Sequence, residues 1–226
     1  MKPTILKKDE KYFNFSNSNF LMLTTKASYS KNIINILSDL KLNENKLAKI
    51  NQIHSDNIVY AEEEGHYGNA DGVISNIQFN ITLSIVTADC IPIFITDSYS
   101  GFFGLIHAGW RGVVKRIHIK SIKEFIKKGA LLKDINIFLG PFIHSCCYEI
   151  KNDIICNFSK QYIHNKENKI YLDLSSIIID DFIKMGIEKK HISKSNICTF
   201  ENLNCYSYRR DRKKSGRMHS IISYKR

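Results

Sequence analysis

Cys90 and His107 are the residues of this sequence whose types and positions are best suited to chemistry. Cys90 lies in the segment TADCIP (residues 87–92), and His107 opens the segment HAGWRG (residues 107–112) seventeen residues later. Each follows a run of apolar residues that predicts a strand and precedes a turn-forming sequence. A thiol and an imidazole at the ends of strands are components of either a zinc site or a thiol-based active site.

His54, in the segment NQIH (residues 51–54), is a third candidate. One thiolate and two imidazoles suit zinc, and three protein ligands leave the fourth tetrahedral position open for water or substrate. The three residues lie on different predicted strands, however, so their types alone favour an inert buried thiol and ordinary histidines. The metal-free alternative is a cysteine hydrolase or transferase with Cys90 as nucleophile and His107 as its base.

Three arginines are candidates for binding an anion. Arg111 precedes a helix expected to start near Val113, so its guanidinium and the free helix amides are placed to receive phosphate or to form a salt bridge. Arg209 and Arg217 are expected to face phosphate or a nucleobase, with a solvated basic tail as the alternative.

Two acidic residues and a pair of cysteines allow weaker predictions. Asp71 and Asp89 are each expected to orient a ligand histidine or to bind a ribose, and the strand alternation favours a role for Asp89 away from the ligands. The adjacent Cys146 and Cys147 are interpreted as packing residues near a turn.

Short β-branched and aromatic runs predict the strands that position these residues. The runs span residues 57–61, 81–87, 93–97, 102–107 and 135–139. Helical spacing predicts helices over residues 32–40, 113–127 and 175–185, with a fourth over 152–163. Ser175 is the expected N-cap of the third helix, and Gly186 is expected to close it. This order predicts an α/β (α+β) fold with a mixed, largely buried β-sheet core flanked by helices.

Composition is that of a soluble globular protein. The 226 residues are 43% hydrophobic and 24% charged, and without a linker or repeat they predict a single domain over residues 1–226. No apolar run is long enough to span a bilayer, and charges interrupt residues 1–15, so we expect a cytoplasmic protein with no membrane partner. In that compartment the six cysteines are expected to be thiols or metal ligands.

The net charge of +11 raises the question of a nucleic-acid partner. Residues 206–226 contain eight basic residues and one acidic residue, so most of the excess lies in a C-terminal basic tail. Arg212, Lys213 and Lys214 are interpreted as solvated. A protein that binds nucleic acid through this tail is the second alternative, but the tail has few interleaved aromatic residues and no nucleic-acid partner is expected.

Several common catalytic motifs are absent from the sequence. It contains no P-loop, GxGxxG, GxSxG or HExxH motif, and no HxE with PCxxC. Nucleotide-triphosphate, dinucleotide, serine-hydrolase, metalloprotease and cytidine-deaminase sites of the usual kinds are therefore excluded.

Six segments together resemble the bacterial zinc-dependent purine nucleoside phosphorylase family, which has also been described as polyphenol oxidase or laccase-like. The resemblance covers nearly the whole chain from about residue 20 and is strongest at HAGWRG and ADC. The segments are NQIH (51–54), ADGV (70–73), TADCIP (87–92), HAGWRG (107–112), GPFI with CCYE (140–143, 146–149) and SYRR with GR (207–210, 216–217).

The resemblance implies an enzyme that cleaves adenosine, inosine, guanosine and methylthioadenosine with phosphate and that deaminates adenosine. By position it implies that His54, Cys90 and His107 are zinc ligands and catalytic residues. It implies purine nucleosides and phosphate as partners, and we expect a monomer or a homodimer. Ser55 and Phe142 depart from the family pattern and are expected to reshape the pocket without removing a ligand.

Copper oxidation is not expected from this sequence. A multicopper oxidase holds its trinuclear cluster with paired HxH histidines, and the eight histidines of this chain include no such pair.

Overall fold

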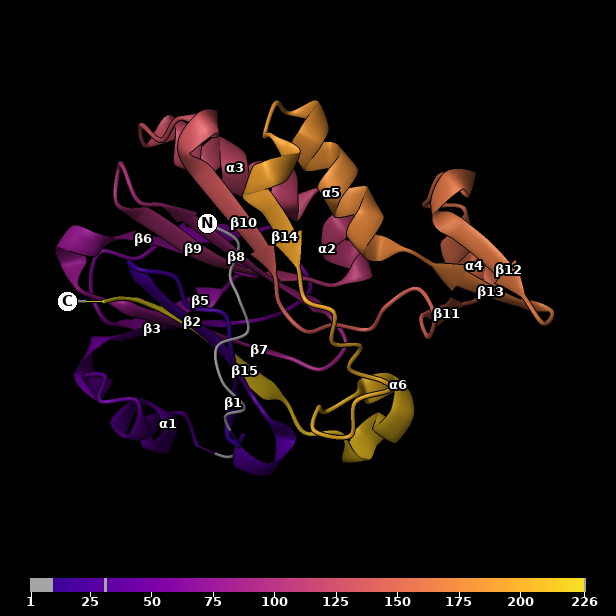
Figure 1. The fold of residues 1–226 in the computed structure, drawn as a ribbon, viewed down its shortest axis with the longest axis horizontal. Coiled ribbons are helices and arrows are strands. Elements are labelled where there is room, and N and C mark those ends of the chain that lie inside the picture. Colours follow the sequence, from indigo (N-terminus) through magenta and orange to yellow (C-terminus); the bar gives the residue numbers. More distant parts are fainter. Residues whose placement is uncertain (1–9, 31, 226) are drawn as a thin grey trace.

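Two mixed β-sheets of six strands each form the centre of the molecule, which is described by a computed structural model over residues 10–30 and 32–225 (Figure 1). Sheet A runs in the order β1 (Tyr12–Asn14), β2 (Phe20–Thr25), β15 (Met218–Tyr224), β7 (Thr82–Thr87), β3 (Leu47–Asn51) and β5 (Gly65–Asn69). Sheet B runs in the order β14 (Ile192–Lys194), β10 (Ile135–Leu139), β8 (Ile91–Asp97), β9 (Phe102–Ala108), β6 (Gly72–Asn76) and β4 (Ile58–Tyr60).

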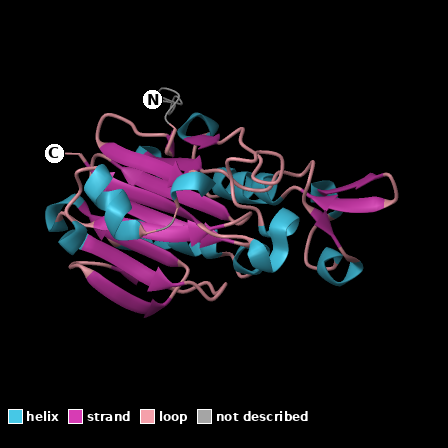
Figure 2. Cartoon of the chain, turned by 90° about the horizontal axis from the view of Figure 1, so that it is seen from below, coloured by secondary structure: helices cyan, strands magenta, loops and turns pink. Residues whose placement is uncertain are grey.

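A third, smaller sheet projects from one end of the molecule (Figure 2). Its order is β11 (Glu149–Ile150), β13 (Lys169–Leu172) and β12 (Ile163–Lys166). The α-helices are α1 (Ile33–Asp39), α2 (Trp110–Val114), α3 (Ile117–Lys127), α4 (Asn152–Ile155), α5 (Leu174–Lys184) and α6 (Tyr208–Asp211). The 3-10 helices are η1 (Ala27–Tyr29), η2 (Glu44–Lys46), η3 (Ile77–Phe79), η4 (Leu132–Asp134), η5 (Lys160–Tyr162), η6 (Lys189–His191) and η7 (Arg212–Lys214).

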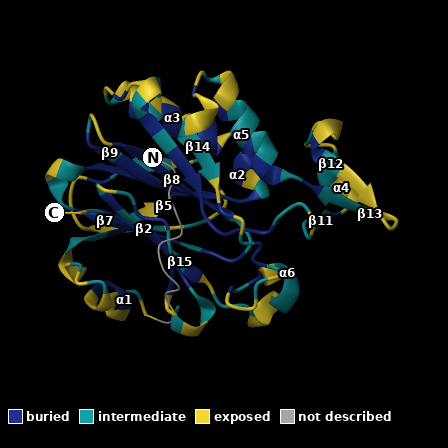
Figure 3. Cartoon of the chain, in the orientation of Figure 1, coloured by how far each residue is buried: buried dark blue, intermediate teal, exposed yellow. Residues whose placement is uncertain are grey.

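The two large sheets pack face to face and helices cover their outer faces, so both sheets are largely buried (Figure 3). Alternation along β8 shows how one strand serves two layers. Ile93 and Ile95 pack against α3 and α5, whereas Phe94 packs against sheet A. On the other side, Ile36 and Leu37 of α1 cover sheet A. Both faces of β8 are apolar because one packs against the helices and the other against sheet A.

The predicted fold class is confirmed, and the five predicted strands correspond to β4, β7, β8, β9 and β10. The core is divided into two large sheets, since β7 pairs with β15 and β3 while β8 to β10 pair among themselves. Within the described residues, no helix is both long and apolar enough to cross a membrane.

The helix predictions need three corrections. The helix expected over 113–127 is divided into α2 and α3, because Arg116 adopts a left-handed φ of 64° between them. The N-cap of α5 is Asp173, whose carboxylate accepts the amide of Ser176, and not Ser175. The helix expected over 152–163 ends after α4, and the chain continues into η5 and β12. Gly186 does close α5, with a φ of 98°.

The interpretation of the C-terminal region as a tail is wrong for most of its length. Residues 218–224 form β15, which lies between β2 and β7 in the middle of sheet A. Arg212, Lys213 and Lys214 are exposed, as predicted, in the turn that precedes this strand. The basic excess therefore lies in a folded segment.

His118 gives the fold a predictable dependence on pH. The side chain is buried between α3 and α5, with Nε2 3.0 Å from Asp181 Oδ2, and Nδ1 has no hydrogen-bond partner among the residues that the structure describes. Burial lowers the pKa of His118, and Asp181 offsets only part of this effect. As the pH falls below about 6.5, the unfolded chain takes up a proton that folded His118 resists, so stability is lost.

We expect His118→Gln, which keeps a donor for Asp181, to show a smaller decrease in Tm between pH 7.5 and pH 5.5 than the unmodified protein. Thermal unfolding at both pH values measures the difference. His164→Gln, at an exposed position in β12, is the control and should retain the full decrease. An equal decrease in all three proteins would contradict the assignment.

Candidate metal centre and substrate pocket

His54, Cys90 and His107 come together although the sequence separates them. The nearest side-chain donor atoms of the three all lie within 4.8 Å of one another. His54 lies in the crossover from β3 to β4, Cys90 in the crossover from β7 to β8, and His107 near the end of β9. Both crossovers pass from sheet A to sheet B, so the cluster lies at one seam between the sheets.

The donor set and spacing fit a tetrahedral metal. Cys90 Sγ lies 3.9 Å from His54 Nε2, and the two histidine rings have centroids 4.8 Å apart at an angle of 73°. Zinc bonds of about 2.3 Å to sulfur and 2.0 to 2.1 Å to nitrogen separate the two ligand atoms by about 3.6 Å. One thiolate and two imidazoles with a remaining open position are a catalytic type of ligand set.

Asp71 orients both histidines. Its buried carboxylate lies 2.8 Å from His107 Nδ1, which leaves His107 Nε2 for the metal position. The same carboxylate accepts the backbone amides of His54 at 3.0 Å and Ser55 at 2.5 Å, and the Ser55 hydroxyl at 2.7 Å. These bonds hold His54 at a left-handed φ of 57°. Of the two roles predicted for Asp71, this geometry favours the orienting one.

The charges of the cluster support one another. Burial would raise the pKa of the Cys90 thiol, but the imidazoles of His107 and His54 lower it to about 6. Burial would lower the pKa of His107, but the Cys90 thiolate and the Asp71 carboxylate raise it. The thiolate required of a metal ligand or a nucleophile is therefore the favoured form of Cys90 at neutral pH.

Gly109 allows the close approach of the ligands. A Cβ atom at this position would lie 2.9 Å from Cys90 Sγ and 3.0 Å from His54 Cδ2. Any larger residue would displace one of these side chains. The glycine of the HAGWRG segment therefore shapes the ligand cluster directly.

The cluster opens into a cavity of about 560 Å³. This volume is typical of sites for small organic ligands, which occupy about 300 to 1,000 Å³. The lining residues are Gln52, His54, Val86, Thr87, Ala88, Asp89, Cys90, His107, Trp110, Arg111, Ile143, Tyr148, Ile154, Tyr208, Arg209 and Arg217.

Three arginines line this cavity, and each is held differently. Arg111 lies with its guanidinium carbon 4.4 Å from the Trp110 ring centroid. It lies in the first turn of α2, which begins at Trp110 and not near Val113 as expected. The guanidinium of Arg209 donates to the Glu149 carbonyl, and that of Arg217 donates to the carbonyls of residues 215 and 216. The cavity is therefore basic on the sides formed by α2 and by α6 with the segment that follows it.

Asp89 and Arg210 act on the cavity through the backbone. Asp89 has a φ of 82°, and its carboxylate accepts the Thr199 hydroxyl at 2.7 Å and the Arg209 amide at 2.6 Å. Arg210 donates to the carbonyls of residues 199, 200 and 205. Both side chains thus fix the segment that places Arg209 at the cavity.

Gln52 and Tyr148 belong to the cavity but were not singled out by sequence. The Gln52 amide pairs with both backbone groups of Val86, at 2.8 and 2.7 Å, and so joins the β3 crossover to β7. Burial raises the pKa of the Tyr148 phenol, and the negative charge of the Cys90 thiolate raises it further. Both lie inside sequence motifs that carry the family resemblance, NQIH and CCYE, and these motifs were the sequence feature that could have identified them.

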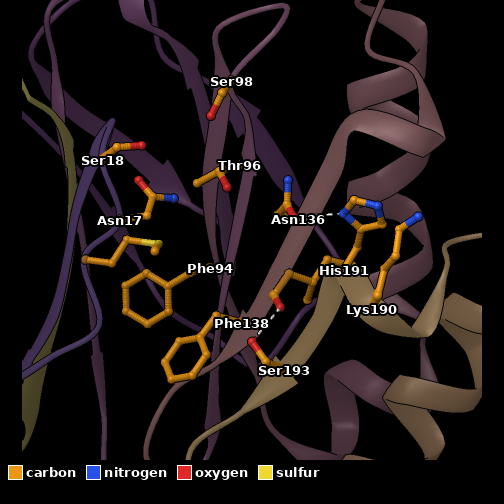
Figure 4. A pocket seen from close by; sticks show the side chains of 12 residues that line it. Asn17, Ser18, Phe94, Thr96, Ser98, Asn136, Phe138, Lys190, His191 and Ser193 are labelled. Carbon is orange, nitrogen blue, oxygen red and sulfur yellow. Dashed lines mark hydrogen bonds between the residues drawn. The ribbon is translucent and has the colours of Figure 1, made fainter. Parts of the chain in front are cut away.

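A second cavity, of about 130 Å³, lies away from this cluster and is shown in Figure 4. Residues of β8, β10 and the segments near β2 and β14 line it, including Phe94, Asn136, Phe138 and His191. His191 Nδ1 is 2.9 Å from Asn136 Oδ1. This second cavity is smaller than the first, and the described residues that line it include no thiol, carboxylate or cluster of metal ligands, so the larger cavity is the better candidate site.

Residues 9–225 match the family described as multi-copper polyphenol oxidoreductase laccase. A purine nucleoside phosphorylase from Borreliella burgdorferi is 34% identical over 73% of this chain and 74% of its own. Adenosine deaminase RL5, from an unknown prokaryotic organism, is 29% identical over 69% of this chain and 63% of its own. The crystal structure of YlmD from Geobacillus stearothermophilus has the same fold, with a TM-score of 0.89, 20% identity, and coverage of 99% of this chain and 100% of its own.

We expect Asp71→Asn to lower zinc affinity by about 10- to 100-fold. An amide nitrogen facing His107 Nδ1 would place the imidazole proton on Nε2, the atom that would bind a metal ion. Competition with a chromophoric chelator measures the affinity. Asp97→Asn is a matched control, because Asp97 is also buried and holds only the turn at residues 99 and 100. Equal zinc affinity in the Asp71 variant and the unmodified protein would contradict the orienting role.

Proposed function

We propose that this chain, which belongs to the family described as multi-copper polyphenol oxidoreductase laccase, is a zinc-dependent purine nucleoside phosphorylase. We propose that it also deaminates adenosine. Relatives that carry the names purine nucleoside phosphorylase and adenosine deaminase support a nucleoside-processing enzyme. The observation that carries the proposal is the His54, Cys90 and His107 cluster at the base of a basic cavity of about 560 Å³. Copper chemistry of the kind in the family description has no support in the histidine pattern of this chain.

In the proposal zinc is held by Cys90 Sγ and by one imidazole nitrogen each of His54 and His107. When bound, zinc supplies a positive charge that activates water or stabilises a purine as it gains negative charge. Asp71 keeps the proton of His107 on Nδ1, so Nε2 stays available as a ligand.

Arg111 is the arginine best suited to bind phosphate. Arg111 is exposed, its guanidinium carbon lies over the Trp110 ring, and within the described residues it forms no ion pair with a carboxylate. The contact with the indole ring favours this position of the guanidinium, and its fork of donors matches a tetrahedral oxyanion. Arg209 and Arg217 also line the cavity and add positive charge to it.

The aromatic side chains are suited to a purine nucleoside. Trp110, Tyr148 and Tyr208 line the cavity and offer flat apolar surface to a base. The phenol of Tyr148 stays protonated because burial raises its pKa, so it can donate a hydrogen bond to a purine nitrogen.

Phosphorolysis and deamination act on opposite ends of the same substrate. In phosphorolysis a phosphate oxygen forms a bond to C1′ as the bond from C1′ to the purine nitrogen breaks. In deamination water attacks C6 and ammonia leaves. We therefore expect either two orientations of the nucleoside or a different role for the metal in each reaction. Incubation of the purified protein with adenosine, with and without phosphate, tests both. Adenine with ribose 1-phosphate, and inosine without phosphate, are the expected products.

We expect Cys90→Ala, His54→Ala and His107→Ala each to lose the zinc ion held by this cluster, and with it both activities. The loss of zinc affinity should exceed about 100-fold, the upper range for a residue that only orients a ligand. Elemental analysis and product chromatography are the measurements. Cys156→Ala, at an exposed cysteine outside the cavity, should keep zinc and activity.

The same variants distinguish a cysteine hydrolase. The low pKa of Cys90 beside His107 is also what a nucleophilic thiolate requires. Activity that survives chelation and the loss of His54, but requires Cys90 and His107, would replace the zinc proposal with the metal-free one.

We expect Arg111→Lys to lower phosphorolysis by about tenfold or more, because charged hydrogen bonds contribute about 1.5 to 3 kcal/mol each. Deamination should change much less, since water attack needs no phosphate. Rates of adenine and inosine formation from one preparation measure the ratio. Arg212→Lys, at an exposed residue outside the cavity, is the control. Equal losses of both reactions would assign Arg111 to the nucleoside or to the local fold.

A further inference from the structure

A second cluster of metal-binding side chains lies where the loop after β10 meets the loop after β14. Cys146, Cys147, Cys198 and Glu201 offer three thiol sulfurs and a carboxylate oxygen, all within 4.8 Å of one another. None of the four lines the larger cavity. The interpretation of Cys146 as a packing residue is wrong, because its side chain is exposed. Fold geometry, and not sequence proximity, brings Cys198 to the other two cysteines.

The local backbone makes this convergence possible. Adjacent residues of a strand point to opposite faces, whereas residues 144–148 form a turn in which the amides of residues 147 and 148 donate to the His144 carbonyl. The turn directs both neighbouring sulfurs to the same side, with Cys146 Sγ and Cys147 Sγ 3.4 Å apart. A tetrahedral zinc with bonds of about 2.3 Å separates two sulfur ligands by about 3.8 Å. A change of a few tenths of an ångström would satisfy it.

Cys198 carries an additional feature of a metal ligand. The backbone amide of His144 points at Cys198 Sγ, at 3.5 Å. An amide donor to sulfur stabilises a thiolate and fixes its direction, as hydrogen bonds to ligand atoms do at metal sites. Cys198 itself is buried, while Cys146 and Glu201 are exposed, so an ion can reach the cluster from solvent.

We propose that Cys146, Cys147, Cys198 and Glu201 form a second, structural zinc site. Three sulfurs and one oxygen complete a closed four-ligand shell, unlike the three-ligand cluster at the cavity. Coordination releases the three thiol protons to solvent and leaves the carboxylate as the fourth ligand. The proposal does not depend on the enzymatic activity proposed above.

The site would join two segments that build the cavity wall. The loop after β10 contributes Ile143 and Tyr148 to the cavity, and the loop after β14 leads to Arg209. Besides the amide of His144 on Cys198 Sγ, a β-bridge between Phe142 and Cys198 and the amide of Thr199 on the Phe142 carbonyl connect the loops near this point. An ion would crosslink them next to that bridge.

Zinc stoichiometry tests the proposal. The full chain, stripped by chelator in the presence of a phosphine reductant, is titrated with Zn²⁺ against a chromophoric competitor. We expect two tight zinc ions per chain, one in Cys90→Ala, one in the double variant Cys146→Ala/Cys147→Ala, and two in Cys156→Ala. The proposal is overturned if the double variant and the unmodified protein bind the same number.

Cobalt provides a second readout that does not depend on folding of the double variant. In Cys90→Ala loaded with Co²⁺, the second site would be the remaining source of thiolate-to-cobalt charge-transfer absorption. We expect this absorption together with the visible bands of tetrahedral cobalt. The absence of these bands would refute the site. A disulfide between Cys146 and Cys147 would also abolish them, and that outcome would equally refute the site. If Cys90→Ala loses one zinc ion but its cobalt form keeps these bands, the two metal sites bind independently.

Discussion

The buried carboxylate of Asp71 is the interaction on which the functional end of the molecule depends. It follows β5, accepts the backbone of the β3 crossover, and contacts a histidine of β9. A buried charge is costly unless hydrogen bonds and opposite charge compensate for it, and here both do. Burial would raise the pKa of Asp71, but the hydrogen bonds with His107 and Ser55 and the charge of His107 lower it to about 2. The Asp71 side chain therefore fixes the tautomer of His107 and the left-handed backbone at His54. It also connects the β3 crossover of sheet A to β9 of sheet B.

The architecture explains why the candidate site lies at this end of the molecule. The chain passes from sheet A to sheet B three times, from β3 to β4, from β5 to β6 and from β7 to β8. These crossovers carry His54, Asp71 and Cys90 respectively. Crossovers leave the regular hydrogen-bond ladders, so their residues can adopt left-handed conformations such as those of His54 and Asp89. The rigid double layer beneath them provides the precise placement that a ligand set needs.

Sequence reasoning predicted the features that arise from local pattern. Strands β7 to β10 were predictable because layers on both faces force continuous apolar runs. Strand β5, with the sequence GHYGN at an edge, has no such run. Strand β15 was missed because basic residues precede it. The break at Arg116 depends on one left-handed residue, and the N-cap of α5 was displaced by a carboxylate two residues earlier. The relation of Cys198 to Cys146 depends on tertiary packing, which periodicity does not encode. The sequence motifs singled out His54, Cys90 and His107 as candidates, but only the fold shows the contacts of Asp71 with the two histidines.

The position of β15 has a consequence for synthesis of the protein. This strand separates β2 from β7, yet both of these partners emerge from the ribosome long before it does. Until β15 arrives, sheet A exposes two unpaired strand edges and the aromatic residues that it will cover. Sheet B, whose strands are complete by residue 194, can form first and serve as a template. During synthesis the facing edges of β2 and β7 therefore stay unpaired until residues 218–224 are available, and of the three cavity arginines Arg209 and Arg217, which precede β15, are the last to be placed.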